Sequence, residues 1–85
     1  MHFINMRLID RYVLIKNKYP NYIVLIKCGN FYNTFYNDAL YINKRFGYKL
    51  INNKVGFPIG VLDKINLCKY ILVDNLSIRM IKQLN

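Results

Sequence analysis

Apolar side chains recur at two different spacings along the chain, and each change of spacing marks the end of an expected element. The first segment, residues 6–18, has the spacing of an amphipathic helix. Its apolar positions are Met6, Ile9, Val13 and Ile15. Asn5 is suited to cap this helix, and Tyr19-Pro20 is expected to end it because the residue before a proline avoids the α region.

A continuous apolar run and an alternating run follow, separated by a glycine. The run Tyr22–Ile26 predicts a buried strand over Tyr22–Cys28, because short stretches rich in Ile, Val and Leu are typical of the centre of a sheet. Gly29-Asn30 predicts a two-residue hairpin turn, since glycine accepts the positive φ that such turns need. We therefore expect a second strand, Phe31–Tyr36, to pair with the first.

This second strand is expected to present different side chains on its two faces, because residues two apart share a face. Phe31, Asn33 and Phe35 are predicted to point to one face. The side chains predicted to point to the opposite face are Tyr32, Thr34 and Tyr36. The first face would combine aromatic rings and an amide beside a tight turn.

Helical spacing returns over Asp38–Phe46. Asn37 is a suitable N-cap, and Asp38 lies in the first turn, where the helix dipole favours negative charge. Gly47 is suited to the C′ position that ends a helix. The side chains that we expect this helix to bury are Ala39, Ile42 and Phe46.

Four further elements are expected in the second half of the chain. Strands Tyr48–Ile51 and Val55–Phe57 are expected around a turn at residues 52–54, with Pro58 ending the second strand. A third helix is expected to begin near Leu62 and to end before a last strand, Leu76–Ile81. The apolar face of that helix would hold Leu62, Ile65, Cys68 and Leu72. The last strand would place Leu76, Ile78 and Met80 on one face.

The resulting order is α-β-β-α-β-β-α-β. It predicts an α/β (α+β) fold in which a small mixed β-sheet is packed with about three helices. The 85 residues are expected to form a single domain, residues 1–85, with no linker, internal repeat or low-complexity segment.

Charge is the strongest feature of the composition: the formal net charge is +9 and no residue is a glutamate. This balance favours a polyanionic partner, with nucleic acid first and an anionic membrane second. The abundance of Asn, Ile, Lys and Tyr is also typical of an A+T-rich coding sequence, so part of the lysine excess has a genomic explanation.

No arrangement of residues indicates an enzyme. The four acids are scattered, the single histidine, His2, lies at the terminus, and there is no phosphate loop. Cys28 and Cys68 lack metal-ligand spacing, so we expect two reduced, partly buried thiols, no metal or cofactor, and a cytoplasmic protein. No apolar run approaches the about 18 residues that a membrane span needs, and no signal peptide is expected.

Several short segments, in the right order, resemble the first domain of the DNA mismatch repair protein MutS. They are Tyr19-Pro20-Asn21-Tyr22, Gly29-Asn30-Phe31-Tyr32-Asn33-Thr34-Phe35, Asp38-Ala39 and Gly56-Phe57-Pro58. The family typically has Pro-Asp, an apolar run, Gly-Asp-Phe-Tyr-Glu-x-Phe and then Asp-Ala. The resemblance covers most of the chain and also implies a mixed sheet surrounded by helices.

The resemblance implies a binding role for the Gly29–Phe35 motif. In MutS, the phenylalanine of this motif enters the minor groove and stacks on a mispaired base, and the glutamate two residues later hydrogen-bonds that base. By position, Phe31 is the wedge and Asn33 replaces the glutamate, while Asn30 replaces the aspartate. We expect double-stranded DNA, mismatched or distorted, as the partner, and no ATP. Candidate phosphate contacts near the motif are Lys27, Lys49 and Lys54.

Two interpretations stay open from the sequence. In the first, Phe31 is exposed and the domain binds mismatched or distorted duplex. In the second, Phe31 is an ordinary core aromatic and the chain is a non-catalytic protein-interaction or accessory module of a larger DNA-processing assembly. The neutral Asn33 favours the second, because it lacks the charge of the family's glutamate.

Overall fold

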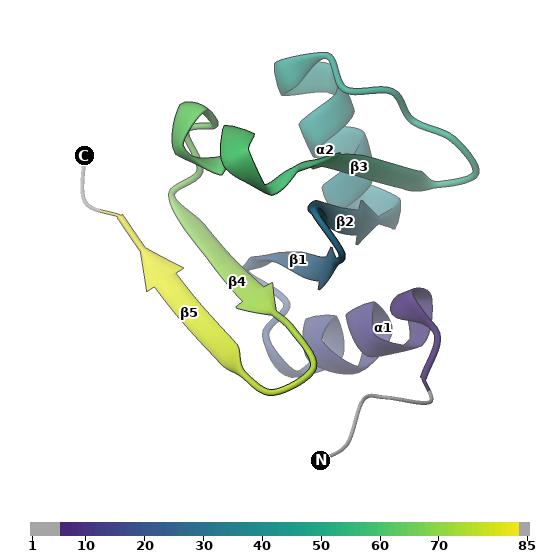
Figure 1. Cartoon of the computed structure of the whole chain (residues 1–85), viewed down its shortest axis with the longest axis vertical. Coiled ribbons are helices and arrows are strands. Elements are labelled where there is room, and N and C mark those ends of the chain that lie inside the picture. The colour runs from purple at the N-terminus through teal and green to yellow at the C-terminus, as the bar shows by residue number, and fades with distance from the viewer. Residues whose placement is uncertain (1–5, 84–85) are drawn as a thin grey trace.

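A five-stranded mixed β-sheet forms the centre of the molecule, with helices on both of its faces (Figure 1). The computed structural model describes residues 6–83. Its elements are α1 (Leu8–Lys18), β1 (Ile23–Cys28), β2 (Phe31–Phe35), α2 (Tyr36–Phe46), β3 (Lys54–Pro58), the 3-10 helix η1 (Ile59–Lys64), β4 (Lys69–Val73) and β5 (Ile78–Lys82). The fold class expected from the sequence is confirmed.

The strand order across the sheet is β3-β2-β1-β4-β5. β1 pairs with β4 in parallel, and all other neighbours are antiparallel. The first hairpin lies where the sequence predicts it: Gly29 has φ +59° in the turn, and Cys28 pairs with Phe31. The continuous apolar run of β1 suits its central place, because a central strand with helices on both sides is buried on both faces.

Two apolar clusters, one on each face of the sheet, form the core. The cluster under α1 contains Tyr12, Ile15, Val24, Ile26, Phe35, Ile71 and Val73. The cluster on the other face, under α2 and η1, contains Leu25, Tyr32, Ala39, Ile42, Val55, Phe57, Ile65, Leu67, Tyr70 and Leu72. In Figure 1, α1 and α2 accordingly lie on opposite sides of β1 and β2.

A buried carboxylate joins the two helices to the sheet. Asp38, in the first turn of α2, is only 4% exposed. It accepts hydrogen bonds from the Tyr12 hydroxyl (2.8 Å), the Lys16 ammonium (3.0 Å) and the backbone N–H of Val24 (3.2 Å). Burial of the Tyr12 hydroxyl, together with the negative charge of Asp38, raises the pKa of Tyr12 above its ordinary value.

This raised pKa predicts a loss of stability in alkali. Above about pH 10 the unfolded chain releases the Tyr12 proton while the folded chain retains it, so rising pH favours unfolding by up to about 1.4 kcal/mol per pH unit. Tyr12→Phe should cost about 2 kcal/mol at neutral pH, because a hydrogen bond to a carboxylate is lost. The free energy of unfolding of the variant should also fall less steeply above about pH 10, because the variant has no Tyr12 hydroxyl to ionise. Urea unfolding between pH 8 and pH 11 measures both effects, and equal alkaline slopes for wild type and variant would contradict the assignment.

The predicted third helix is wrong. Its first part is the short 3-10 helix η1, and its last part is strand β4. Residues 70–73 are all buried, and they pair in parallel with Ile23–Ile26 of β1. Such a continuous run buried on both faces is typical of a strand beside the centre of a sheet, so the helical spacing of Leu62, Ile65, Cys68 and Leu72 was coincidental. The expected last strand is present as β5, but it begins at Ile78 rather than at Leu76.

The predicted strand Tyr48–Ile51 is also wrong, since only Ile51 forms an isolated bridge, with Lys54. Asn52 and Asn53 both have positive φ, at +51° and +63°, and make a tight turn directly before β3. The Tyr48 carbonyl instead accepts a 2.8 Å hydrogen bond from the Asn43 side chain of α2. The backbone before the turn is thereby held against the helix rather than in the sheet.

Both α-helices begin at a residue other than the expected one. α1 begins at Leu8, later than Met6, and the expected cap Asn5 and His2 lie outside the described residues. α2 begins at Tyr36, so Asn37 lies inside its first turn rather than at the N-cap. The expected end of α2 is confirmed, because Gly47 is left-handed (φ +81°) and its N–H donates to the Asn43 carbonyl.

Candidate nucleic-acid interface

The ring of Phe31 lies at the surface, at the start of β2 and directly after the Gly29-Asn30 turn. It is 47% exposed, and the apolar cluster under α1 includes Phe35 but not Phe31. Of the two interpretations of this side chain, core aromatic and exposed ring, the structure supports the exposed one. Asn30, in the turn, is exposed as well, and its carbonyl accepts a hydrogen bond from the Ile59 N–H.

Phe31, Asn33 and Phe35 share one face of β2, as the sequence predicts, and that face also holds Gly56 of β3. Asn33 pairs with Gly56 across the two strands. A Cβ atom on Gly56 would lie 2.9 Å from the Asn33 Oδ1 and 3.7 Å from the Phe31 Cδ2. The absence of a side chain at Gly56 therefore leaves room for both the amide and the ring.

The Asn33 side chain is more deeply placed than a surface base contact would be, with 6% of the residue exposed. Within residues 6–83 no hydrogen bond to the protein occupies its side-chain amide. Buried amides usually form such bonds, and Asn33 is an exception. Its amide therefore keeps a donor and an acceptor available beside the exposed ring of Phe31.

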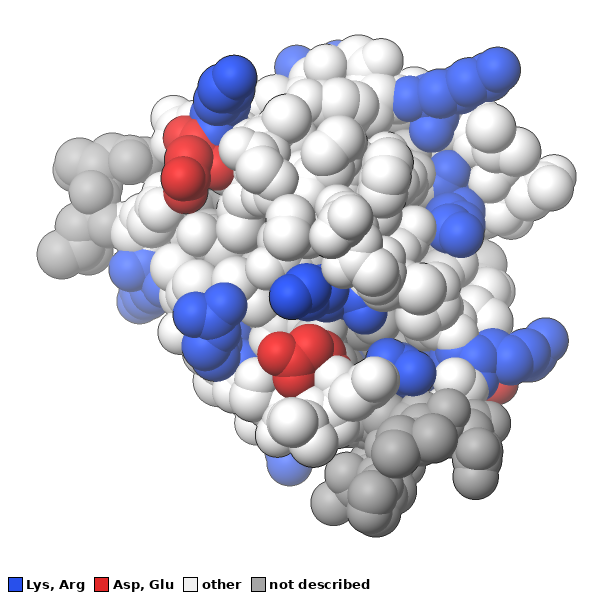
Figure 2. Space-filling view, in the orientation of Figure 1, with Lys and Arg blue, Asp and Glu red and all other residues white. Residues whose placement is uncertain are grey.

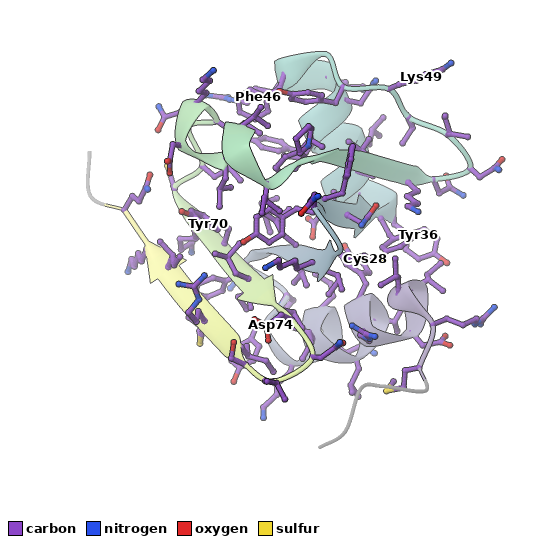
Figure 3. All side chains as sticks on the ribbon, in the orientation of Figure 1. Cys28, Tyr36, Phe46, Lys49, Tyr70 and Asp74 are labelled. Carbon is purple, nitrogen blue, oxygen red and sulfur yellow. The ribbon has the colours of Figure 1, made fainter. Side chains whose placement is uncertain are left out.

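Two of the three predicted lysines lie on this same face. Lys49 and Lys54 line a hollow of about 450 Å³ together with Phe35, Ile51, Asn52 and Gly56. Lys54 pairs with Phe35 across β2 and β3, and Figure 3 shows Lys49 extending outward from the loop after α2. Phe31 and Asn33 therefore share a face of the β2–β3 pair with Lys49 and Lys54, but Phe31 lies at one end of β2 and the two lysines lie at the other end.

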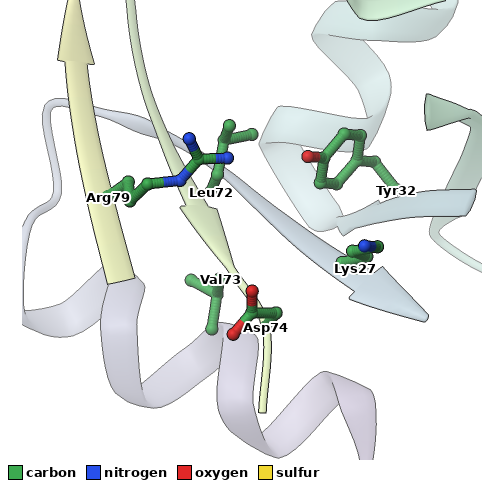
Figure 4. Close-up of a pocket in the computed structure, with 6 residues that line it drawn as sticks. All are labelled: Lys27, Tyr32, Leu72, Val73, Asp74 and Arg79. Carbon is green, nitrogen blue, oxygen red and sulfur yellow. The ribbon is translucent and has the colours of Figure 1, made fainter. Parts of the chain in front are cut away.

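Lys27 lies on the opposite face. It pairs with Tyr32, which belongs to the other apolar cluster, and it lines a recess of about 50 Å³ with Leu72, Val73, Asp74 and Arg79 (Figure 4). Lys27 is therefore separated by the sheet from the ring of Phe31.

The same recess contains residues that the sequence did not single out, Tyr32, Asp74 and Arg79. Hydrogen bonds from the N–H groups of Leu76 and Ser77, both 2.8 Å long, hold the pKa of Asp74 below its ordinary value, and the charge of Lys27 lowers it further. Arg79 stands across from Leu72 in the β4–β5 pairing. No sequence signal could have placed Arg79 near Lys27, because their proximity depends on the long-range parallel pairing of β1 and β4.

Lysine and arginine side chains are spread over the visible surface, with acidic side chains between some of them, rather than gathered in one patch (Figure 2). The net charge of +9 is therefore not concentrated in a single patch on this face, and it does not by itself mark a binding surface.

The described residues contain no group of three or more metal-ligating side chains. Among the acids, Asp38 is engaged with α1 and β1, and Asp10 forms an exposed ion pair with Arg7. In the same part of the chain, no helix has the length and hydropathy needed to cross a bilayer.

Both cysteines are exposed, so their predicted partial burial is wrong. Cys28 is the last residue of β1, beside the turn (Figure 3), and it pairs with Phe31. Cys68 lies just before β4. Since β1 and β4 run in parallel, the two thiols are at opposite ends of the sheet.

The chain matches a known protein family. The family model described as MutS domain I matches residues 6–84. A DNA mismatch repair protein MutS from Chlorobium chlorochromatii (strain CaD3) is 30% identical over 50 residues, which is 59% of this chain. The matched segment is only 6% of the length of that protein.

Proposed function

The chain belongs to the MutS domain I family, and from that premise we propose that it is a module that binds mispaired or distorted duplex DNA through the ring of Phe31. The observation that carries the proposal is the exposure of this ring at the tip of the β1–β2 hairpin. Binding, not catalysis, is the proposed activity.

Insertion of an apolar ring gives a physical means of discrimination. Wedging a side chain between base pairs costs a few kcal/mol of stacking, and the cost is lowest where pairing or stacking is already weak. An exposed phenyl ring next to a tight turn can enter a groove without moving the core. The ring therefore favours sites where the duplex is easily opened.

The neighbouring groups provide weaker contacts. Asn33 stands where the family has a glutamate, and its neutral amide offers a base edge a donor and an acceptor without charge assistance. Lys49 and Lys54, which line a hollow on the same face, are the proposed phosphate contacts. A module of this size buries at most about 600–1,000 Å² on DNA, so the proposed binding is weak and salt-sensitive.

Alkylation of the two exposed cysteines can show where DNA binds. Cys28 lies across from Phe31 on the same face, so a bound duplex carrying a mispair should slow its alkylation by a maleimide several-fold. Cys68, at the other end of the sheet, is the internal control and should react at its original rate. Mass spectrometry after timed alkylation measures both sites. Unchanged alkylation of Cys28 at saturating DNA would contradict binding through Phe31.

The alternative function, an accessory module that contacts another protein, is favoured by a different surface. Strand β5 is an edge of the sheet, and Ile78 and Met80 on it are exposed. Leu76, just before β5, is 94% exposed. Such apolar side chains beside an unpaired strand edge suit a protein partner. Failure to recover a stable partner by co-purification would count against this alternative.

A further inference from the structure

Strand β5 is one edge of the sheet, and within residues 6–83 no strand pairs with its outer side. We propose that this edge binds an extended acidic segment of a partner protein, which adds to the sheet as a further strand. The inference does not depend on DNA binding through Phe31, and it assigns a chemistry to the partner. Apolar side chains and carboxylates occupy defined positions along the bound segment.

The backbone hydrogen bonds between β4 and β5 show which groups of β5 point outward. The N–H of Asp74 donates to the carbonyl of Ser77 (3.0 Å), and the N–H of Gln83 donates to the carbonyl of Cys68 (2.7 Å). Hydrogen-bonded pairs alternate along an antiparallel ladder, so residues 77, 79, 81 and 83 bond toward β4. The N–H and C=O groups of residues 78, 80 and 82 therefore point away from β4 and are open to an added strand.

The other edge of the sheet, β3, is less suited to a partner strand. The N–H of Ile59 donates to the Asn30 carbonyl (2.9 Å), so by the same alternation residues 54, 56 and 58 point outward from β3. Pro58 has no N–H to donate, and Gly56 has no side chain to pack against a partner. All three outward-pointing residues of β5 have both an N–H and a side chain. Of the two edges, β5 is therefore the one open to pairing.

Two apolar side chains lie along the β5 edge, on the face of the sheet that α1 covers. Ile78 and Met80 pair with Val73 and Ile71, which are fully buried in the cluster under α1. Ile78 and Met80 are nevertheless 42% and 48% exposed. They extend the apolar layer of the sheet beyond its buried part, so an added strand would cover them with apolar side chains of its own.

The charges of β5 favour an acidic partner. Arg79 and Lys82 are exposed, and Lys82 stands directly across from Lys69 of β4. Like charges placed opposite each other destabilise a strand pair, so a carboxylate beside these lysines would offset their repulsion. A second copy of the chain is less suitable, because each copy has a net charge of +9. An antiparallel β5–β5 pair centred on Met80 would also place Arg79 and Lys82 opposite isoleucines rather than acids.

The pairing predicts the order of side chains in an antiparallel partner. From its N-terminus, the segment would place an acid opposite Lys82, any residue opposite Ile81, an apolar residue opposite Met80, an acid opposite Arg79 and an apolar residue opposite Ile78. The test uses a labelled peptide with this order, Glu-Thr-Val-Glu-Val. Its control, Thr-Val-Glu-Val-Glu, has the same composition and charge but sets its glutamates against the apolar side chains. Fluorescence anisotropy should show that wild type binds the first peptide at least about tenfold more tightly.

Met80→Pro removes one outward N–H without breaking a hydrogen bond to β4, and it should reduce the affinity for the first peptide to that for the second. Met80→Ala is the matched control, because it also removes the methionine side chain but keeps the N–H, and it should bind the first peptide more tightly than Met80→Pro. Equal binding of the two peptides by wild type, or equal binding of the first peptide by the two variants, overturns the proposal. A wild-type dimer in sedimentation that Met80→Pro abolishes would assign the edge to a second copy and also overturn it.

Discussion

Replacing Asp38 with alanine lowers the free energy of unfolding by about 3 kcal/mol. The variant leaves the Tyr12 hydroxyl, the Lys16 ammonium and the Val24 N–H without their shared acceptor. Removing one partner of a buried ion pair costs about 3–5 kcal/mol, and the lower end applies here because Lys16 is partly exposed. Urea unfolding followed by circular dichroism measures the change.

Asp10→Ala is the control for this effect. Asp10, in the first turn of α1, also accepts hydrogen bonds from a basic side chain, that of the N-cap residue Arg7, but this pair is exposed. Surface ion pairs contribute little, so the unfolding curve of Asp10→Ala should stay close to that of wild type. Equal unfolding curves for wild type and Asp38→Ala would show that Asp38 does not hold α1 and α2 to the sheet.

Phe31→Ala is expected to weaken binding to a mispaired duplex by at least about tenfold, since an intercalating aromatic contributes about 1–3 kcal/mol of stacking. The folded state should be little affected, because the ring lies outside both apolar clusters. The variant should retain the weaker, salt-dependent attraction that comes from the overall positive charge. Fluorescence anisotropy of a labelled duplex measures the affinity.

Tyr41→Ala is the matched control, because Tyr41 is an exposed aromatic on α2 and its ring lies 5.8 Å from the guanidinium of Arg45 on the same helix. It removes an aromatic side chain from a surface that the proposal does not use. Its affinity for the mispaired duplex should equal that of wild type. If Phe31→Ala and Tyr41→Ala bind alike, the wedge role has to be abandoned.

Local sequence patterns were sufficient for the first half of the fold. The apolar run of β1, the Gly29 turn and the alternation of β2 each depend on residues close in sequence, and the structure has all three. They also placed Phe31, Asn33 and Phe35 on one face. The depth of Asn33 could not be predicted, because it depends on the pairing of β2 with β3 and on Gly56.

The second half of the fold depends on contacts between distant residues. The apolar run of residues 70–73 is compatible with a helix or a strand. It forms a strand because it pairs with β1, which lies more than forty residues earlier in the sequence. The sequence explained Asp38 by its place at a helix start, but its partners on α1 are 22 and 26 residues away. The separation of Lys27 from Phe31 likewise follows from the alternation of β1 within the assembled sheet.

The most direct test of the central claim is the affinity of wild type for a duplex with one G·T mispair relative to its matched twin, measured by anisotropy over a salt series. Both duplexes carry the same phosphates, so salt should weaken both equally. We predict tighter binding to the mispaired duplex, with a ratio that stays constant as the salt concentration rises. Equal affinities at every salt concentration would contradict the account and leave only a general attraction of a basic protein for DNA.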